Sequence, residues 1–251
     1  MSFLSGIFSK TKTETETNIP VLVDMHSHLI PGIDDGSENI EDSYMLVKEL
    51  SELGYTKIIT TPHIMGDFFK NSAENILPKL EELKKYLAER NILVELEAAA
   101  EYYLDEWFME KLKKNQPLLS FGGAERYLLF ETSYINSSAY LDEAIFTLKS
   151  LGYKPVLAHP ERYMYLQNNI EALILLKQRG VLYQININSL AGYYNKGAQL
   201  TAEKLIDHNM VDMIGTDCHG IRHVESLKKA MQTKYYKKVI GQKLLNNSLL
   251  G

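Results

Sequence analysis

The chain alternates short apolar runs with longer amphipathic segments, and this alternation restricts its fold more than any other feature. Seven apolar runs with the length of strands cover residues 21–28, 57–61, 91–100, 126–130, 155–158, 181–187 and 211–215. Most of the segments between them repeat apolar residues at helical spacing, and several end at glycine. Strands that alternate with helices in this way form an α/β fold with a parallel sheet, either open or closed into a barrel.

The expected helices cover residues 40–53, 72–90, 105–114, 138–150, a segment that runs to 180, 201–208, and the tail from about 223 onward. We expect Pro78 to break the second helix near its start, because proline lacks the backbone N–H that a helix interior needs. Residues 1–20 are predicted to be a flexible polar lead-in. Residues 21–251 contain no linker and are predicted to form a single catalytic domain, since α/β barrels of this size are common.

Residues that can bind metal ions follow the ends of these predicted strands. Five of the seven histidines have this position, and three carboxylates have it on other strands: His26, His28, His63, His159, His219, Glu101, Glu131 and Asp217. Active sites of parallel α/β folds are built at that end of the sheet. The pattern therefore predicts a site for more than one metal ion.

The first strand carries two histidines, His26 and His28, whose side chains point the same way if the strand is regular. A Pro-Gly turn follows, and the paired Asp34 and Asp35 after it offer hard oxygen ligands. Asp24 has two interpretations of equal weight. It is either an acceptor for an imidazole N–H behind the metal ligands, or a solvated or barrel-filling acid.

These residues occur within the motifs Thr61-Pro62-His63, His159-Pro160-Glu161-Arg162 and Thr216-Asp217-Cys218-His219. Together they resemble the PHP (polymerase and histidinol phosphatase) family, and within it the bacterial manganese-dependent protein-tyrosine phosphatases of capsule and exopolysaccharide synthesis. The resemblance runs from about residue 21 to beyond residue 219. It implies a distorted TIM-like barrel of about seven βα units.

The resemblance also implies the metal ligands, which are His26, His28, Asp35, His63, Glu101, Glu131, His159, Asp217 and His219. Nine ligands suit three divalent ions that share carboxylates, with manganese implied and iron or zinc as alternatives. Metal ions lower the pKa of bound water toward about 7. The implied reaction is therefore attack of a metal-bound hydroxide on phosphotyrosine of a protein, implied to be a bacterial tyrosine kinase that controls capsule or exopolysaccharide synthesis.

The phosphate should be bound by local positive charge, because the chain as a whole has a net charge of −5. Arg162 is the best candidate, since a guanidinium binds phosphate in bidentate fashion. Arg222 and His223 follow the last predicted ligand and are candidates to contact phosphate or protonate the leaving oxygen. Arg222 is a displaced substitute, because Val224 stands roughly where the family usually has an arginine.

Cys218 is not expected to be a nucleophile. A cysteine-dependent tyrosine phosphatase needs an arginine after five intervening residues, and this chain has Val224 there. Three other functions stay open: a phosphatase for a small phosphoester such as histidinol phosphate, an amidohydrolase, and a metal-stabilised kinase-binding protein without activity. The single cysteine fits a reducing compartment, so we expect a cytoplasmic protein. The charge and hydropathy predict no nucleic-acid partner and no membrane insertion, and they leave the oligomeric state open.

Overall fold

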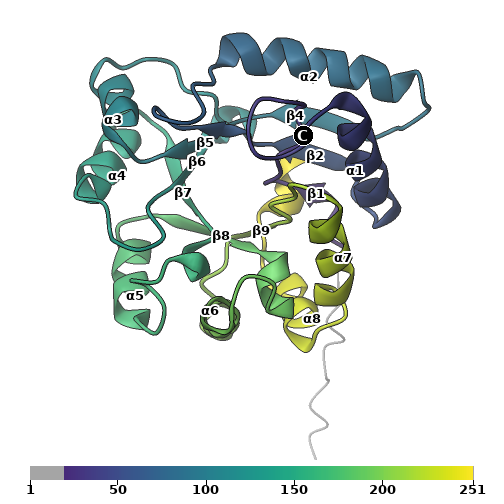
Figure 1. Ribbon diagram of the computed structural model, residues 1–251. Helices are drawn as coiled ribbons and strands as arrows, with labels where there is room; N and C mark the ends of the chain where they lie inside the picture. Colours follow the sequence, from purple (N-terminus) through teal and green to yellow (C-terminus); the bar gives the residue numbers. More distant parts are fainter. Residues whose placement is uncertain (1–19, 251) are drawn as a thin grey trace, which may run out of the picture.

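The computed structural model describes residues 20–250, whose strands form a ring with helices around its outside (Figure 1). The expected lead-in therefore lies, apart from Pro20, outside the described residues. All neighbouring strands are parallel. One sheet pairs β1 (Val23–Asp24), β2 (Lys57–Thr60) and β4 (Glu95–Ala98) in that order. The other pairs β3 (His63–Ile64), β5 (Glu101–Tyr103), β6 (Tyr127–Glu131), β7 (Lys154–Ala158), β8 (Leu182–Asn186) and β9 (Met213–Gly215).

Hydrogen bonds between the two ends of the strand series close the ring. Just beyond β1 and β9, Ser27 and Cys218 form a parallel bridge. The backbone N–H of His28 donates to the carbonyl of Cys218 at 2.9 Å, and that of Asp217 donates to the carbonyl of His26 at 2.8 Å. The alternation of strands and helices therefore produces a closed, distorted barrel rather than an open sheet.

The expected strands 57–61 and 91–100 are each followed, after a short interruption, by a second strand that was not expected. β3 follows β2, and β5 follows β4. Glu101 therefore begins β5, whereas the sequence placed it after the end of a strand. The interruptions shift the chain from one sheet to the other and account for the distortion of the barrel.

The helices lie outside the ring of strands (Figure 1). Along the sequence, most of the strands are followed by a helix. The helices are α1 (Ile40–Glu52), α2 (Ala73–Ala88), α3 (Glu106–Lys113), α4 (Leu141–Ser150), α5 (Ile170–Gln178), α6 (Lys196–Asp207), α7 (Ile221–Ala230) and α8 (Lys234–Ile240). Short 3₁₀ helices are η1 (Gly123–Glu125), η2 (Pro160–Arg162), η3 (Ile187–Ala191) and η4 (Asn246–Leu249). Among residues 20–250, no helix is long and apolar enough to cross a membrane.

The predicted break at Pro78 is wrong, because α2 continues through this residue. Reciprocal capping bonds between Ser72 and Asn75 fix the start of the helix, and one face of α2 is buried along its length. Burial of an apolar face supplies most helix stability in proteins, so it offsets the backbone hydrogen bond that proline lacks. The helix α6 also begins earlier than expected, because the side chain of Asn195 accepts the backbone N–H of Ala198.

Two apolar clusters make up the core. The larger one lies between the strands and the surrounding helices. The smaller one takes side chains from strands all around the ring, which places it inside the barrel: Val23, Ile59, Leu129, Val156 and Met213 are among its members. Leu249 of η4 joins this inner cluster, so the C-terminal segment packs against one end of the barrel interior.

Asn246 fastens the seam between the first and last strands. Its side-chain amide donates to the carbonyls of Val23 and Ile214, and its oxygen accepts the N–H of Ile214. We expect Asn246→Ala to lower the free energy of unfolding by about 3 kcal/mol, because it leaves buried backbone groups without partners. For a chain of this size, thermal denaturation should show a Tm lower by about 5–10 °C.

Asn247→Ala is the matched control for this prediction. Asn247 also bonds two backbone groups, those of Leu22 and Pro20, but it is only partly buried. Water can replace its bonds, so the expected loss is below about 1 kcal/mol. Equal losses of Tm in the two variants would show that the seam is not a special point of stability.

Candidate active site

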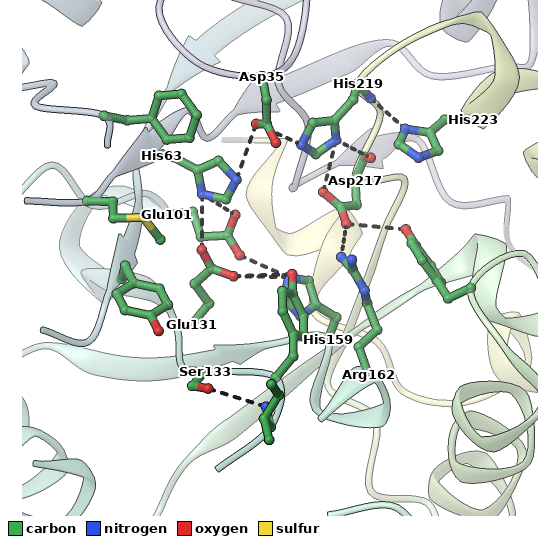
Figure 2. A pocket seen from close by; sticks show the side chains of 16 residues that line it. Asp35, His63, Glu101, Glu131, Ser133, His159, Arg162, Asp217, His219 and His223 are labelled. Atoms are coloured by element: carbon green, nitrogen blue, oxygen red, sulfur yellow. Dashed lines mark hydrogen bonds and ion pairs between the residues drawn. The ribbon is translucent and has the colours of Figure 1, made fainter. Parts of the chain in front are cut away.

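The nine predicted ligands converge at one end of the barrel, although they come from six of the seven predicted strands and their flanking loops. Their ligand atoms form four groups, each with atoms within 4.8 Å of one another, and every predicted ligand belongs to at least one group. The groups are His28–Asp35–His63–His219, His26–His28–Asp217, His26–Glu101–His159 and His63–Glu101–Glu131. Figure 2 shows seven of these side chains directed toward a common centre.

Glu101 is the centre of this arrangement. Its Oε2 lies 3.2 Å from His26 Nε2 and 3.2 Å from His63 Nδ1, and its Oε1 lies 3.1 Å from His159 Nε2. Glu131 is also 3.2 Å from His63 Nδ1. Because one carboxylate serves two groups, neighbouring sites can share ligands.

Two side chains that were not identified as ligands orient the first two histidines. Asp34 accepts a hydrogen bond from Nδ1 of His28 at 2.7 Å. Gln184, whose oxygen lies 2.8 Å from Nδ1 of His26, orients that ring in the same way. Both bonds leave Nε2 directed at the cluster, and partners of this kind set the tautomer of ligating histidines. Asp34 therefore orients a ligand, and so does Gln184, a residue that was not predicted from the sequence.

Asp24 matches neither interpretation fully. Its carboxylate accepts the backbone N–H and the hydroxyl of Thr216, so it joins the first and last strands beside the site. It also lies 3.5 Å from the backbone N of His26, and within residues 20–250 it accepts no hydrogen bond from an imidazole ring. Burial raises the pKa of Asp24 to about 6 despite these bonds.

The backbone bends sharply where two of the ligands stand. His159 has φ 33° and Asp217 has φ 50°, values in the left-handed region that side-chain-bearing residues rarely adopt. Such strained residues cluster at functional sites. Gly215 explains another close approach, because a Cβ there would lie 2.7 Å from the Cβ of His26. The last strand can therefore approach the first only with glycine at this position.

The cluster is rich in buried negative charge. Burial raises the pKa of Glu101, but the neighbouring His26 and His63 hold it well below its usual range. Burial lowers the pKa of His63, yet the carboxylates of Glu101 and Glu131 outweigh this effect and raise it to about 9. Buried carboxylates therefore need positive charge beside them, which is the environment that a cation requires.

The side chains fit divalent metal ions. Glu101 Oε1, His63 Nδ1 and His159 Nδ1 are buried and make no hydrogen bond within residues 20–250. His26 Nε2 and His28 Nε2 face each other at 3.3 Å. Buried nitrogen and oxygen atoms that converge, several of them without a hydrogen-bond partner, are typical of a ligand sphere, and imidazole with carboxylate suits manganese, iron or zinc.

A cavity of about 570 Å³ opens over the cluster, and Arg162 lies in its wall (Figure 2). The Nη1 of Arg162 donates to Asp217 Oδ2 at 2.9 Å. The guanidinium carbon lies 4.7 Å from the ring centre of Tyr134 and 4.1 Å from that of Tyr194. Two aromatic rings and a carboxylate therefore hold the guanidinium at the edge of the ligand cluster.

The structure places His223 in this cavity wall and Arg222 outside it. His223 Nδ1 accepts the backbone N–H of His219 at 2.8 Å, so the proton of the neutral ring is on Nε2. Burial lowers the pKa of His223 to about 4. Arg222 is exposed and does not line the cavity, because successive residues of α7 point about 100° apart.

Cys218 is buried in the core, as predicted. Burial raises the pKa of its thiol, so the thiol stays protonated at neutral pH and is a poor nucleophile. We expect Cys218→Ala to keep kcat within about threefold of the wild type, and iodoacetamide to leave the folded enzyme active. Rapid inactivation by iodoacetamide that Cys218→Ala prevents would contradict this assignment.

Comparisons with known proteins cover almost the whole described chain. Residues 22–249 match the model of a family described as capsular polysaccharide synthesis, CpsB/CapC. The chain is 30% identical over 224 residues to the tyrosine-protein phosphatase CpsB of Streptococcus pneumoniae. This alignment covers 85% of this chain and 88% of that protein. The chain is 28% identical over 201 residues to the tyrosine-protein phosphatase YwqE of Bacillus subtilis, with 80% and 78% covered.

Solved structures agree with this result. One similar structure comes from work on YwqE of Bacillus subtilis and CpsB of Streptococcus pneumoniae, which are called "unique metal-dependent tyrosine phosphatases". It superposes on this chain with a TM-score of 0.75 at 25% sequence identity. The superposition covers 88% of this chain and 96% of that one. The phosphotriesterase homology protein of Escherichia coli superposes with a TM-score of 0.55 at 15% identity, over 90% and 97%, and shares the barrel fold.

The fold and the site together define a metal-dependent tyrosine phosphatase of the PHP type. The cluster of carboxylates and imidazoles is at the end of the barrel where such folds carry their active sites. The chain belongs to the CpsB/CapC family of capsular polysaccharide synthesis.

Proposed function

We propose that this phosphatase removes phosphate from tyrosine residues of a protein, namely a bacterial tyrosine kinase that controls capsule or exopolysaccharide synthesis. The observation that carries the proposal is the position of Arg162, which faces an open cavity beside the ligand cluster. A guanidinium at this point suits the phosphoryl group of a phosphomonoester. The names of the relatives support phosphotyrosine on a protein, and the family description supports the link to capsule synthesis.

We propose further that the cluster holds three divalent ions, with manganese as the first candidate and iron or zinc as alternatives. The ligands would be the nine convergent side chains, because their four overlapping groups offer too many donors for one ion. When bound, the ions would supply charge to the phosphoryl oxygens and a nucleophile formed from water at neutral pH.

The chain's own residues would bind and orient the substrate. Arg162 keeps N–H groups beyond the one given to Asp217, and these can hold the phosphoryl oxygens as their charge grows. His223 would donate a hydrogen bond from Nε2, because its Nδ1 already accepts the N–H of His219. This tautomer favours a contact to the phosphate over proton transfer to the leaving oxygen. A phenolate leaving group, whose conjugate acid has a pKa of about 10, also needs little help from an acid.

The proposed substrate class is tested with purified protein loaded with manganese. We expect phosphate release from a phosphotyrosine peptide and none above background from histidinol phosphate, because Phe69 and Tyr134 line the cavity beside Arg162 and can pack against a phenyl ring. The same peptide with phosphoserine is the matched control for the aromatic ring. Faster release from histidinol phosphate would favour a small-molecule phosphatase, and no release from any substrate would favour a binding protein without activity.

Two further proposals concern the organisation and location of the chain. We propose that residues 21–251 are a single catalytic domain preceded by the polar segment 1–20, because one ring of strands includes elements from both ends of this range. We also propose the cytoplasm as the location, supported by the single cysteine.

A further inference from the structure

Exposed apolar side chains surround the mouth of the cavity. Phe68, Ile135 and Met164 are 77%, 64% and 62% exposed, and Tyr193 and Ile221 are exposed as well. These five residues, the apolar rim, lie in the segments that follow β3, β6, β7, β8 and β9. Those segments leave the barrel at the end that carries the ligand cluster. Apolar side chains gathered around a site in this way are typical of a binding surface.

The turn that bears Phe68 is built into the cavity wall. Met65 and Phe69 exchange two backbone hydrogen bonds, of 2.9 Å and 3.0 Å, and both line the cavity. The Phe69 ring stacks on His63 with ring centres 5.6 Å apart. Phe68 is at the tip of this turn and points to solvent. The turn therefore presents Phe68 outward and Phe69 inward at the mouth of the cavity.

The opposite side of the mouth is also apolar. Ile135 itself lines the cavity, and the next segment is tied to it, because the N–H of Met164 donates to the carbonyl of Tyr134 at 2.7 Å. On a third side, the ring of Tyr193 contacts His223, which lines the cavity, at 4.9 Å between ring centres. The rim is thus continuous with the cavity wall.

We propose that the apolar rim binds the polypeptide on both sides of the phosphotyrosine, so that the preferred substrate is an extended protein segment with apolar side chains near that residue. This inference rests on the proposed function. A phosphoryl group at Arg162 leaves the rest of the substrate chain at the mouth, where the rim begins. A small phosphoester would fit within the cavity of about 570 Å³ and leave the rim uncovered.

The rim is expected to act on binding rather than on chemistry. Its residues lie away from the reacting phosphate, so they contact the peptide equally before and during the reaction, and such contacts change KM without changing kcat. Truncation of one buried apolar contact weakens binding by about tenfold. Small aryl phosphates do not reach the rim and should not respond.

The test compares an apolar phosphotyrosine peptide with p-nitrophenyl phosphate in manganese-loaded Phe68→Ser and Met164→Ser, two rim residues that do not line the cavity. For the peptide we expect KM to rise about tenfold in each variant at constant kcat, and for p-nitrophenyl phosphate no change. Leu93→Ser and Phe146→Ser are matched controls, because these side chains are 94% and 74% exposed but lie outside the rim. The controls should leave the KM of both substrates unchanged.

Three results would overturn the inference. The first is an unchanged KM for the peptide in both rim variants, and the second is an equal rise of KM for both substrates. The third is a wild-type dimer that dissociates in Phe68→Ser while the KM for the peptide stays constant. That result would mean that the rim binds a second copy of the chain. A wild-type enzyme that hydrolyses neither substrate would overturn the proposed function itself and is distinguishable from all three.

Discussion

Replacement of Glu101 by glutamine is expected to lower kcat/KM for a phosphotyrosine peptide by about a thousandfold or more. Glu101 is fully buried and belongs to two of the four ligand groups. Glutamine keeps the shape of the side chain and removes its charge, so both groups lose an anionic donor. A metal site contributes several kcal/mol to the transition state, and about 1.4 kcal/mol corresponds to a tenfold change in rate.

Steady-state kinetics and metal analysis of the same preparation check this prediction, and the metal content should fall together with the activity. Glu97→Gln is the matched control. Glu97 lies in β4, within the same predicted strand of residues 91–100, but its carboxylate pairs with Lys57 at 2.7 Å and is only partly buried. The variant Glu97→Gln should keep normal activity and metal content. Wild-type activity and metal content in Glu101→Gln would contradict the central role of this carboxylate.

Replacement of Arg162 by alanine should lower kcat/KM by about a hundredfold to a thousandfold while leaving the metal content unchanged. The loss of one preorganised donor to a developing negative charge has this size. Tyr134, Tyr194 and Asp217 hold the guanidinium in place, so its position is set before substrate binds. Kinetics with a phosphotyrosine peptide, together with metal analysis, separate substrate binding from metal binding.

Two variants make this prediction more specific. Arg162→Lys should recover only part of the activity, because a lysine keeps the charge but cannot form the planar bidentate contact. Arg222→Ala should be close to wild type, because Arg222 is exposed outside the cavity. An equal loss of activity in Arg162→Ala and Arg222→Ala would contradict the different positions that the structure gives the two arginines.

The strand ends could be read from the sequence because they combine two regular signals. Apolar runs of strand length mark the strands, and histidines or carboxylates follow them, so the convergence of His28, His159 and Asp217 needed no knowledge of tertiary contacts. The closed barrel was less accessible. Its closure depends on Ser27 meeting Cys218 and on Asn246 bonding across the seam, contacts that span most of the chain and have no periodic signature.

The positions of the remaining candidate residues have local physical reasons. Arg222 and His223 are neighbours in sequence, but α7 begins at Ile221, and only His223 of the two lines the cavity. Gln184 was overlooked because an amide within a strand has no signal of its own, and its role depends on the opposing His26. Arg162 lines the same cavity as His159, because an arginine three residues after a strand-end histidine in a short 3₁₀ helix stays close to that histidine; its role in phosphate binding stays a prediction.

The convergent carboxylates and imidazoles are expected to bind divalent ions without which the enzyme cannot hydrolyse phosphotyrosine. The most direct measurement removes metal with a chelator, confirms its absence by elemental analysis, and follows phosphate release from a phosphotyrosine peptide as manganese is returned. We expect no release above background from the metal-free protein and recovery of activity as the ions bind. Full activity in protein that contains no detectable metal would contradict this expectation.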